Sequence, residues 1–186
     1  MQRSQMTEQI LIKSLKKLVM KTPFEKITIR DITDEAGLIR PTFYNHFKDK
    51  YDLMEVIFYS DIIEPSNPLI ENNMFYDALR LILNNIEKDR RFYRKLMRND
   101  SNGNMKTIVM HCFKKMLRVA VERINPAYMA KSEILTPDTV AEYYANTLLF
   151  VMEKWLNLEE EISADEVADM LIKVSNEPLS RLLAQE

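Results

Sequence analysis

Glycine is scarce in this chain, where only Gly37 and Gly103 occur among 186 residues. An all-β protein needs glycine at its tight turns, and a Rossmann fold needs it in the loop that binds phosphate. Long segments of helix-forming residues, with apolar positions recurring every three or four residues, fill the chain instead. The sequence therefore predicts an all-α fold.

The composition is that of an ordinary globular protein, with 46% hydrophobic and 29% charged residues. Cys112 is the single cysteine, which excludes an intrachain disulfide and a cysteine-rich zinc site. The N-terminal residues carry charges throughout and lack a signal-peptide cleavage site, and no apolar run approaches the roughly 18 residues that a membrane span needs. We expect a cytoplasmic protein with no cofactor, no metal and no membrane partner.

Charge is distributed unevenly along the chain, although the net charge is only -2. Residues 1–50 contain 10 Lys and Arg against 6 Asp and Glu, whereas residues 51–186 contain 16 against 22. A basic head on an acidic body is typical of a DNA-binding protein that has a separate regulatory domain. The asymmetry supports nucleic-acid binding by the head without establishing it.

Start and stop signals divide the first third of the chain into expected helices over 7–20, 29–36, 40–47 and 50–63. Thr28 is a good N-cap for the second helix, with Asp31 three residues on in a capping-box position. Gly37 closes that helix, and Pro41 lies in the first turn of the next one, where its missing N–H costs nothing. Asp49 caps the fourth helix, which we expect to stop before the prolines at 65 and 68.

Helices are also expected farther along, at about 74–87, 89–98, 105–124, 138–157 and 164–185. We divide the chain into a helix-turn-helix domain at residues 1–48 and an all-helical ligand-binding and dimerisation domain at residues 49–186. The expected fold is a three-helix DNA-binding head joined to a helical bundle.

The segment from Thr28 to Met54 carries the strongest functional signal. Two short helices meet at a glycine turn, and six apolar residues can form one small core beneath them: Ile29, Ile32, Ala36, Leu38, Phe43 and Phe47. This arrangement leaves the second helix free to enter a DNA major groove. On that helix Arg40 and Thr42 suit base edges. Tyr44, His46 and Lys50 suit phosphate oxygens, which fix register without specifying sequence.

At these residues the chain resembles the TetR/AcrR family of transcriptional regulators. The resemblance covers about residues 8–58 and rests on Thr28, Ala36-Gly37, Phe43-Tyr44, His46-Phe47, Lys50 and Leu53. It implies a homodimer that binds double-stranded operator DNA, with dimerisation through the last two helices. Carried over by position, the implied DNA contacts are Thr28, Arg30, Arg40, Pro41, Thr42, Tyr44, His46 and Lys50. Asn45 stands where the family varies, so either DNA or solvent is its partner.

Residues 43–53, FYNHFKDKYDL, together with Ile57-Phe58-Tyr59, also resemble the dihydroxyacetone-kinase regulator subgroup. Some members of such subgroups respond to a partner protein instead of a small molecule. Two readings of the body therefore stay open: an unknown small-molecule effector, or a partner protein. Repression of transcription is the expected activity.

Three alternatives compete with the DNA contacts. Arg30 could pair with Asp34 one turn later instead of reading a base. The segment could be a helical hairpin with no DNA role, but its polar outer face would then have no reason to combine Arg40, Tyr44 and Lys50. An enzyme is the other class, and we find no nucleophile elbow, phosphate loop, metal motif or paired acids.

Aromatic residues of the body suggest an effector pocket, for which we select Phe92, Phe113, Tyr143 and Phe150. Core packing is the alternative for each of them. The last two expected helices also hold more apolar residues than one buried stripe needs, which predicts a two-fold four-helix dimer interface. The residues behind this prediction are Leu148, Leu149, Val151, Met152, Val167, Met170, Leu171, Val174, Leu179 and Leu182.

Overall fold

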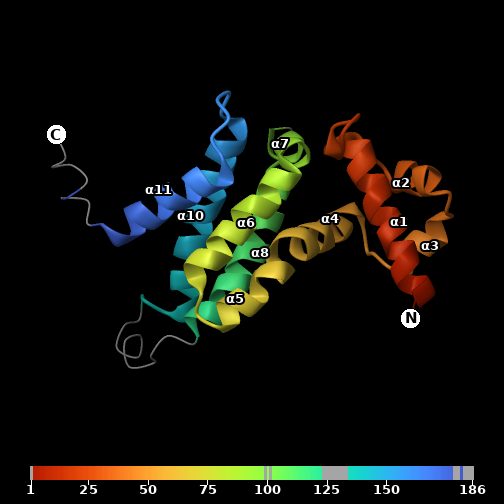
Figure 1. The fold of residues 1–186 in the computed structure, drawn as a ribbon. Helices are drawn as coiled ribbons and strands as arrows, with labels where there is room; N and C mark the ends of the chain where they lie inside the picture. The colour runs from red at the N-terminus through yellow and green to blue at the C-terminus, as the bar shows by residue number, and fades with distance from the viewer. Residues whose placement is uncertain (1, 99, 101, 123–133, 178–180, 182–186) are drawn as a thin grey trace.

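The computed structural model describes residues 2–98, 100, 102–122, 134–177 and 181. Within these ranges every regular element is helical, which confirms the predicted all-α class. A small head at the N-terminal end and a larger body lie side by side, and one helix, α4, runs from the head into the body (Figure 1). No described helix is both long enough and apolar enough to span a membrane.

The head contains α1 (Gln2–Val19), the 3-10 turn η1 (Phe24–Lys26), α2 (Ile29–Ala36) and α3 (Arg40–Tyr44). No helix breaker precedes Thr7, so α1 begins five residues earlier than expected. The third helix ends at Tyr44 instead of Phe47, because the chain turns there, with the amides of His46 and Phe47 both donating to the carbonyl of Phe43. Phe43 and Phe47 are nevertheless buried in the predicted head core, together with Leu11, Leu15 and Ile32.

The linking helix α4 (Lys50–Phe58) begins where expected, and the Asp49 carboxylate accepts hydrogen bonds from the amides of Tyr51 and Asp52. It continues through a π-helical turn, η2 (Tyr59–Ile63). The two prolines beyond it do not stop helical structure, contrary to expectation. They occupy the first turns of η3 (Glu64–Ser66) and α5 (Asn67–Glu71), where proline is well tolerated.

The body contains α6 (Phe75–Lys88), α7 (Arg90–Arg98), α8 (Asn104–Val121), α10 (Pro137–Asn157) and α11 (Ala164–Asn176). These bounds agree with the five expected helices, and the part of the last one expected beyond residue 177 falls largely outside the described residues. Phe58 of the linking helix enters the body core, where its ring contacts those of Tyr93 and Phe113 edge to face at 5.9 and 5.5 Å. The link between head and body is therefore anchored in the largest apolar cluster.

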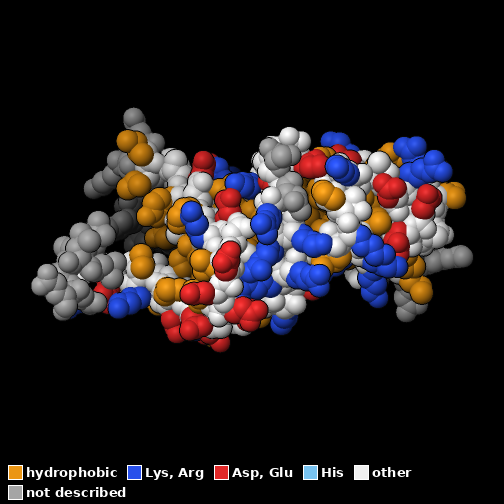
Figure 2. All heavy atoms as spheres, turned by 90° about the horizontal axis from the view of Figure 1, so that it is seen from above, with side chains coloured by type: hydrophobic (Ala, Val, Ile, Leu, Met, Phe, Trp, Pro, Cys, Tyr) orange, Lys and Arg blue, Asp and Glu red, His pale blue; other side chains and the backbone are white. Residues whose placement is uncertain are grey.

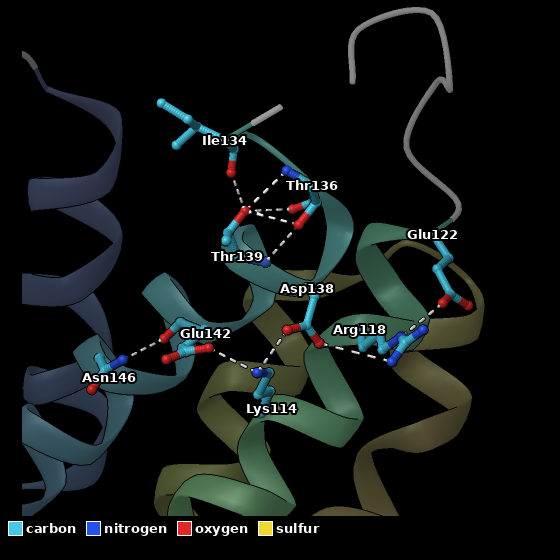
Figure 3. A network of polar contacts seen from close by, with 9 residues as sticks. All are labelled: Lys114, Arg118, Glu122, Ile134, Thr136, Asp138, Thr139, Glu142 and Asn146. Atoms are coloured by element: carbon cyan, nitrogen blue, oxygen red, sulfur yellow. Dashed lines mark hydrogen bonds and ion pairs between the residues drawn. The ribbon is translucent and has the colours of Figure 1, made fainter. Parts of the chain in front are cut away.

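The long helices α8 and α10 pack side by side, and a polar network joins them at one end (Figure 3). Lys114 of α8 forms ion pairs with Asp138 at 2.8 Å and Glu142 at 2.7 Å. Thr136 and Thr139 form a capping box that starts α10 beside these pairs. Exposed ion pairs contribute little free energy, so the network mainly fixes how the two helices are aligned.

Lys16 of α1 forms one of two polar clusters at the junction between head and body. Its ammonium lies 2.7 Å from Asp61 of the π-helical turn and 2.7 Å from Asp89, between α6 and α7. Burial lowers the pKa of Lys16, but hydrogen bonds from the ammonium to the two carboxylates outweigh burial and raise the pKa overall. Lys16 is therefore a charged bridge from the head to two elements of the body.

The second polar cluster at this junction centres on Tyr51 of α4. Its hydroxyl donates to Glu25 of η1 at 3.1 Å and accepts from the side-chain amide of Asn104, the first residue of α8, at 3.3 Å. Burial and the nearby Glu25 carboxylate raise the pKa of Tyr51. The protonated hydroxyl thus connects the head, the linking helix and the body.

Candidate DNA-binding site

The helix α2 begins at the capping box that the sequence predicts. The Asp31 amide donates to the Thr28 hydroxyl at 3.2 Å, and the Thr28 amide donates to the Asp31 carboxylate at 2.8 Å. The Thr28 hydroxyl also donates to the Asp31 carboxylate at 2.7 Å, and this hydrogen bond and the one from the Thr28 amide lower the pKa of Asp31. Gly37 ends the helix with φ at +65°, a left-handed conformation that glycine adopts without steric strain. Local sequence therefore fixes both ends of α2 and the turn into α3.

The helix α3 turns its apolar side to the head core and its polar side to solvent. Phe43 is fully buried, whereas Arg40, Tyr44 and Asn45 are exposed. Thr42 is half-buried beside them. The Arg40 guanidinium donates to the Tyr44 hydroxyl across one helical turn, at a long 3.4 Å. Such a weak contact leaves the guanidinium available to another acceptor.

The remaining predicted contacts flank α3. Pro41 is exposed in its first turn, and His46 is half-buried just beyond its end. Arg30 of α2 lies 3.5 Å from Asp34, so the alternative ion pair considered for it is present. Both side chains of that pair are highly exposed, so the pair is weak and Arg30 can exchange Asp34 for a phosphate. Thr28, Arg30 and α3 lie on adjoining parts of the head.

Lys50 is placed differently from the other predicted phosphate contacts. Its ammonium donates to three backbone carbonyls around η1, those of Phe24, Glu25 and Ile27, at 2.9, 3.0 and 2.9 Å. An ammonium group has three hydrogens, so all of its donors are in use. Burial lowers the pKa of Lys50, which Glu25 partly offsets. In this structure Lys50 joins α4 to the turn before α2, and its ammonium faces protein carbonyls.

Ile39 was not singled out from the sequence. It is the N-cap residue of α3 and is 68% exposed, which is unusual for a branched apolar side chain. An apolar group beside Arg40 suits the methyl group of a thymine. Its position directly after the Gly37-Leu38 turn was the signal that could have identified it. Lys48 is also exposed nearby and is a further candidate for a phosphate contact.

The four aromatic residues selected for an effector pocket do not line one cavity. Phe92 and Phe113 are buried in the body core, whereas Tyr143 and Phe150 are 68% and 60% exposed. The inner face of α10 is formed instead by Ala141, Ala145, Met152, Trp155 and Leu156, which are buried. Two of these residues are small alanines, which allow α8 to approach closely. The two exposed aromatic residues are seven positions apart and share the outer face of α10.

A helix-turn-helix head on an all-helical body defines a class of transcriptional regulators. Residues 11–57 match the family described as "Bacterial regulatory proteins, tetR family", and residues 73–177 match "Transcriptional regulator C-terminal region", a TetR C-terminal family. The second match alone spans more than half of the chain. The chain therefore belongs to the TetR family. The matched families and relatives are described as transcriptional regulators and not as enzymes.

One curated relative is the HTH-type dhaKLM operon transcriptional activator DhaS of Lactococcus lactis subsp. lactis (strain IL1403), 30% identical over 102 residues. The match covers 55% of this chain and 54% of that protein, about half of its length. Its name agrees with the narrower resemblance noted from the sequence.

Solved structures of TetR-family regulators share the fold. The dihydroxyacetone kinase operon activator DhaS is 22% identical with a TM-score of 0.56, and the alignment covers 90% of this chain and 93% of that one. NalD, a repressor of the MexAB-OprM efflux pump in Pseudomonas aeruginosa, is 16% identical with a TM-score of 0.63, covering 92% and 94%. At these identities the likeness concerns the fold alone.

Proposed function

We propose that this chain is a cytoplasmic transcription factor that binds a palindromic operator in double-stranded DNA as a homodimer, and that an effector acting on the body modulates this binding. The observation that carries the proposal is the outer face of α3. Arg40, Tyr44 and Asn45 are exposed there, while Phe43 and Phe47 hold the helix on the head core. Exposed groups on a rigidly held helix are what major-groove recognition requires.

Within this proposal the head residues have two roles. Arg40 and Thr42 read base edges, and Ile39 adds an apolar contact to them. The phosphate backbone is held by Thr28, Arg30, Tyr44 and His46, with Pro41 and Asn45 close to the DNA surface. Lys50 supports the turn before α2 instead of contacting phosphate.

Selection of bound duplexes from a random pool tests the proposal directly. We expect an enriched palindrome whose half-sites lie on one face of the duplex, about one helical turn or somewhat more apart. Affinity for it should fall steeply as salt rises, because several phosphates are neutralised. A pool that shows no enriched sequence at any salt concentration contradicts sequence-specific DNA binding by the head.

The proposed dimer interface is the outer face of α10 and α11. Tyr143, Tyr144 and Phe150 of α10 are exposed, as are Met170 and Val174 of α11. Figure 2 shows orange hydrophobic side chains gathered at the α10 and α11 end of the molecule. A second copy would cover this apolar surface, which is unusual for a monomer.

The apolar residues first expected at that interface divide into several groups. Met152 and Val167 are buried within the chain itself. Leu148, Leu149, Val151 and Leu171 are partly buried against the core, and only Met170 and Val174 are largely exposed. Leu179 and Leu182 lie outside the described residues.

Phe150→Glu is expected to weaken dimerisation by about 2 kcal/mol or more, roughly thirtyfold, because it places a charge in a desolvated apolar interface. Analytical ultracentrifugation over a concentration series measures the change. Met6→Glu is the matched control, since Met6 is equally exposed on α1 of the head, far along the chain from this surface. An unchanged dimer dissociation constant in the Phe150 variant would show that the dimer interface lies elsewhere on the chain.

Two activities remain to be distinguished, repression and activation of transcription. The sequence favours a repressor, whereas the relative DhaS is described as an activator. A reporter gene placed behind the selected operator distinguishes them by the sign of its response. A partner protein that replaces the small-molecule effector is the second candidate, favoured because the four aromatic residues selected for an effector pocket do not line one cavity. Native mass spectrometry of the purified chain distinguishes a bound small molecule from a bound protein.

A further inference from the structure

A pocket of about 340 Å³ lies between α1 of the head and the turn that joins α6 to α7 in the body. Lys16 and Lys17 line it from the head, and Lys88, Asp89 and Arg91 line it from the body. Figure 2 shows Lys and Arg side chains along the region where head and body meet. Of the four aromatic residues selected for an effector pocket, Phe92 lines this pocket and Phe113, Tyr143 and Phe150 do not. The volume of the pocket is in the range of small-ligand sites.

Charges around the pocket are only partly balanced. Lys16 is held by Asp61 and Asp89, and Lys17 forms an ion pair with Glu35. The lining residues and their ion-pair partners together contain four cationic groups and three carboxylates. The carboxylates are those of Asp61, Asp89 and Glu35.

The unbalanced charge lies on the body side of the pocket. Lys88 donates to the neutral side chain of Asn85 at 2.8 Å, and Arg91 is exposed at the start of α7. Among the described residues no carboxylate forms an ion pair with either of them. The surplus amounts to one positive charge, which suits a ligand with a single negative charge.

The rest of the pocket wall is apolar. Met20, directly after α1, is half-buried and Phe92 of α7 is 4% exposed, and both line the pocket. A thioether and an aromatic ring provide a surface for a small hydrophobic group. We propose that this pocket binds a small organic monocarboxylate, with its charge beside Lys88 and Arg91 and its apolar part against Met20 and Phe92.

The position of the pocket gives such a ligand a regulatory role. One wall belongs to the DNA-binding head and the other to the body, so a bound molecule contacts both. It also lies beside Lys16, which links α1 to Asp61 of the π-helical turn in the linking helix. Occupancy would favour one angle between head and body, and only such differential affinity can alter DNA binding. This part rests on the proposed function, whereas ligand binding itself does not.

Fluorine NMR titration of the full chain with 4-fluorobenzoate tests the site without DNA. The neutral isostere 4-fluorobenzamide is the ligand control. We expect 4-fluorobenzoate to bind about tenfold more tightly than the amide, and raising the salt concentration to reduce that difference. Binding of both compounds with equal affinity would overturn the assignment of an anion, and a Kd above about 10 mM for 4-fluorobenzoate would overturn the site.

The variant Lys88→Gln/Arg91→Gln keeps the Lys16 bridge and removes the two lining cations that form no ion pair with a described carboxylate. It should weaken 4-fluorobenzoate binding about tenfold and leave the amide unaffected. Arg98→Gln is the matched control, because Arg98 is exposed on the same helix and does not line the pocket. Equal affinity in the double variant and the wild type would place the ligand elsewhere. A chain that binds its operator but not 4-fluorobenzoate loses this site while keeping the proposed function.

Discussion

Arg40→Ala is expected to lower affinity for the selected operator by about 1–3 kcal/mol for each half-site, so by about 2–6 kcal/mol for a dimer. Arg40 is exposed on α3, where its guanidinium donates a long 3.4 Å hydrogen bond to the Tyr44 hydroxyl. The side chain can leave that contact and form a bidentate pair with guanine. Its loss should relax the preference at one base pair in each half-site.

The measurement compares the selected operator with a scrambled duplex over a salt series. Arg40→Lys is the matched variant, because it keeps the charge and loses the bidentate geometry. If Arg40 reads a base, the lysine variant also loses discrimination, while both variants keep most of their affinity for the scrambled duplex. Equal losses of affinity for the two duplexes would show that Arg40 contacts a phosphate and does not read a base.

Features set by neighbouring residues were predictable from sequence. Thr28 and Asp31 stand three positions apart, and the capping box they form needs no distant partner. Gly37 adopts the left-handed conformation that its place after a helix implies. The apolar pattern of 29–47 likewise predicted the head core, because one small helical pair has only one side on which to bury Phe43 and Phe47.

Features set by tertiary packing were not predictable in this way. The seven-residue spacing of Tyr143 and Phe150 places them on one face of α10, but spacing does not say whether that face meets the core. The small residues Ala141 and Ala145 mark the face that packs on α8, and they are the signal that was missed. The bridge from Lys16 to Asp61 depends on a π-helical turn, which shifts the register of the helix and leaves little trace in sequence.

The position of Lys50 in α4 is set by neighbouring residues, but the contacts of its ammonium are set by tertiary packing. The sequence predicted that Lys50, the first residue of α4, contacts a DNA phosphate. The structure instead brings η1, more than twenty residues earlier, beneath its ammonium, which also lies 4.8 Å from the centre of the Phe24 ring. Because η1 is so far from Lys50 in sequence, the three carbonyl acceptors could not be predicted from neighbouring residues. A structural role and a phosphate contact predict different effects of a Lys50 substitution on the salt dependence of DNA binding.

Lys50→Met is expected to destabilise the head by about 2–4 kcal/mol, because three hydrogen bonds from a charged donor are lost and the carbonyls of Phe24, Glu25 and Ile27 are left without this partner. Methionine retains the length of the side chain and much of its apolar contact. Hydrogen exchange of the α2 amides measures the local effect, since local opening need not follow unfolding of the body. Faster exchange in α2 is the expected result.

DNA binding by the same variant decides between the two roles. If Lys50 supports the turn before α2, operator and scrambled DNA weaken together and the slope of log affinity against log salt is unchanged. If Lys50 contacts a phosphate, the slope falls by about 0.9 and exchange in α2 is unaffected. Lys13→Met is the control, because Lys13 is exposed on α1 and is not among the proposed DNA contacts, so its replacement should change stability by less than about 0.5 kcal/mol and leave the slope unchanged. A flatter slope in Lys50→Met with an intact head would restore the phosphate contact that the sequence predicts.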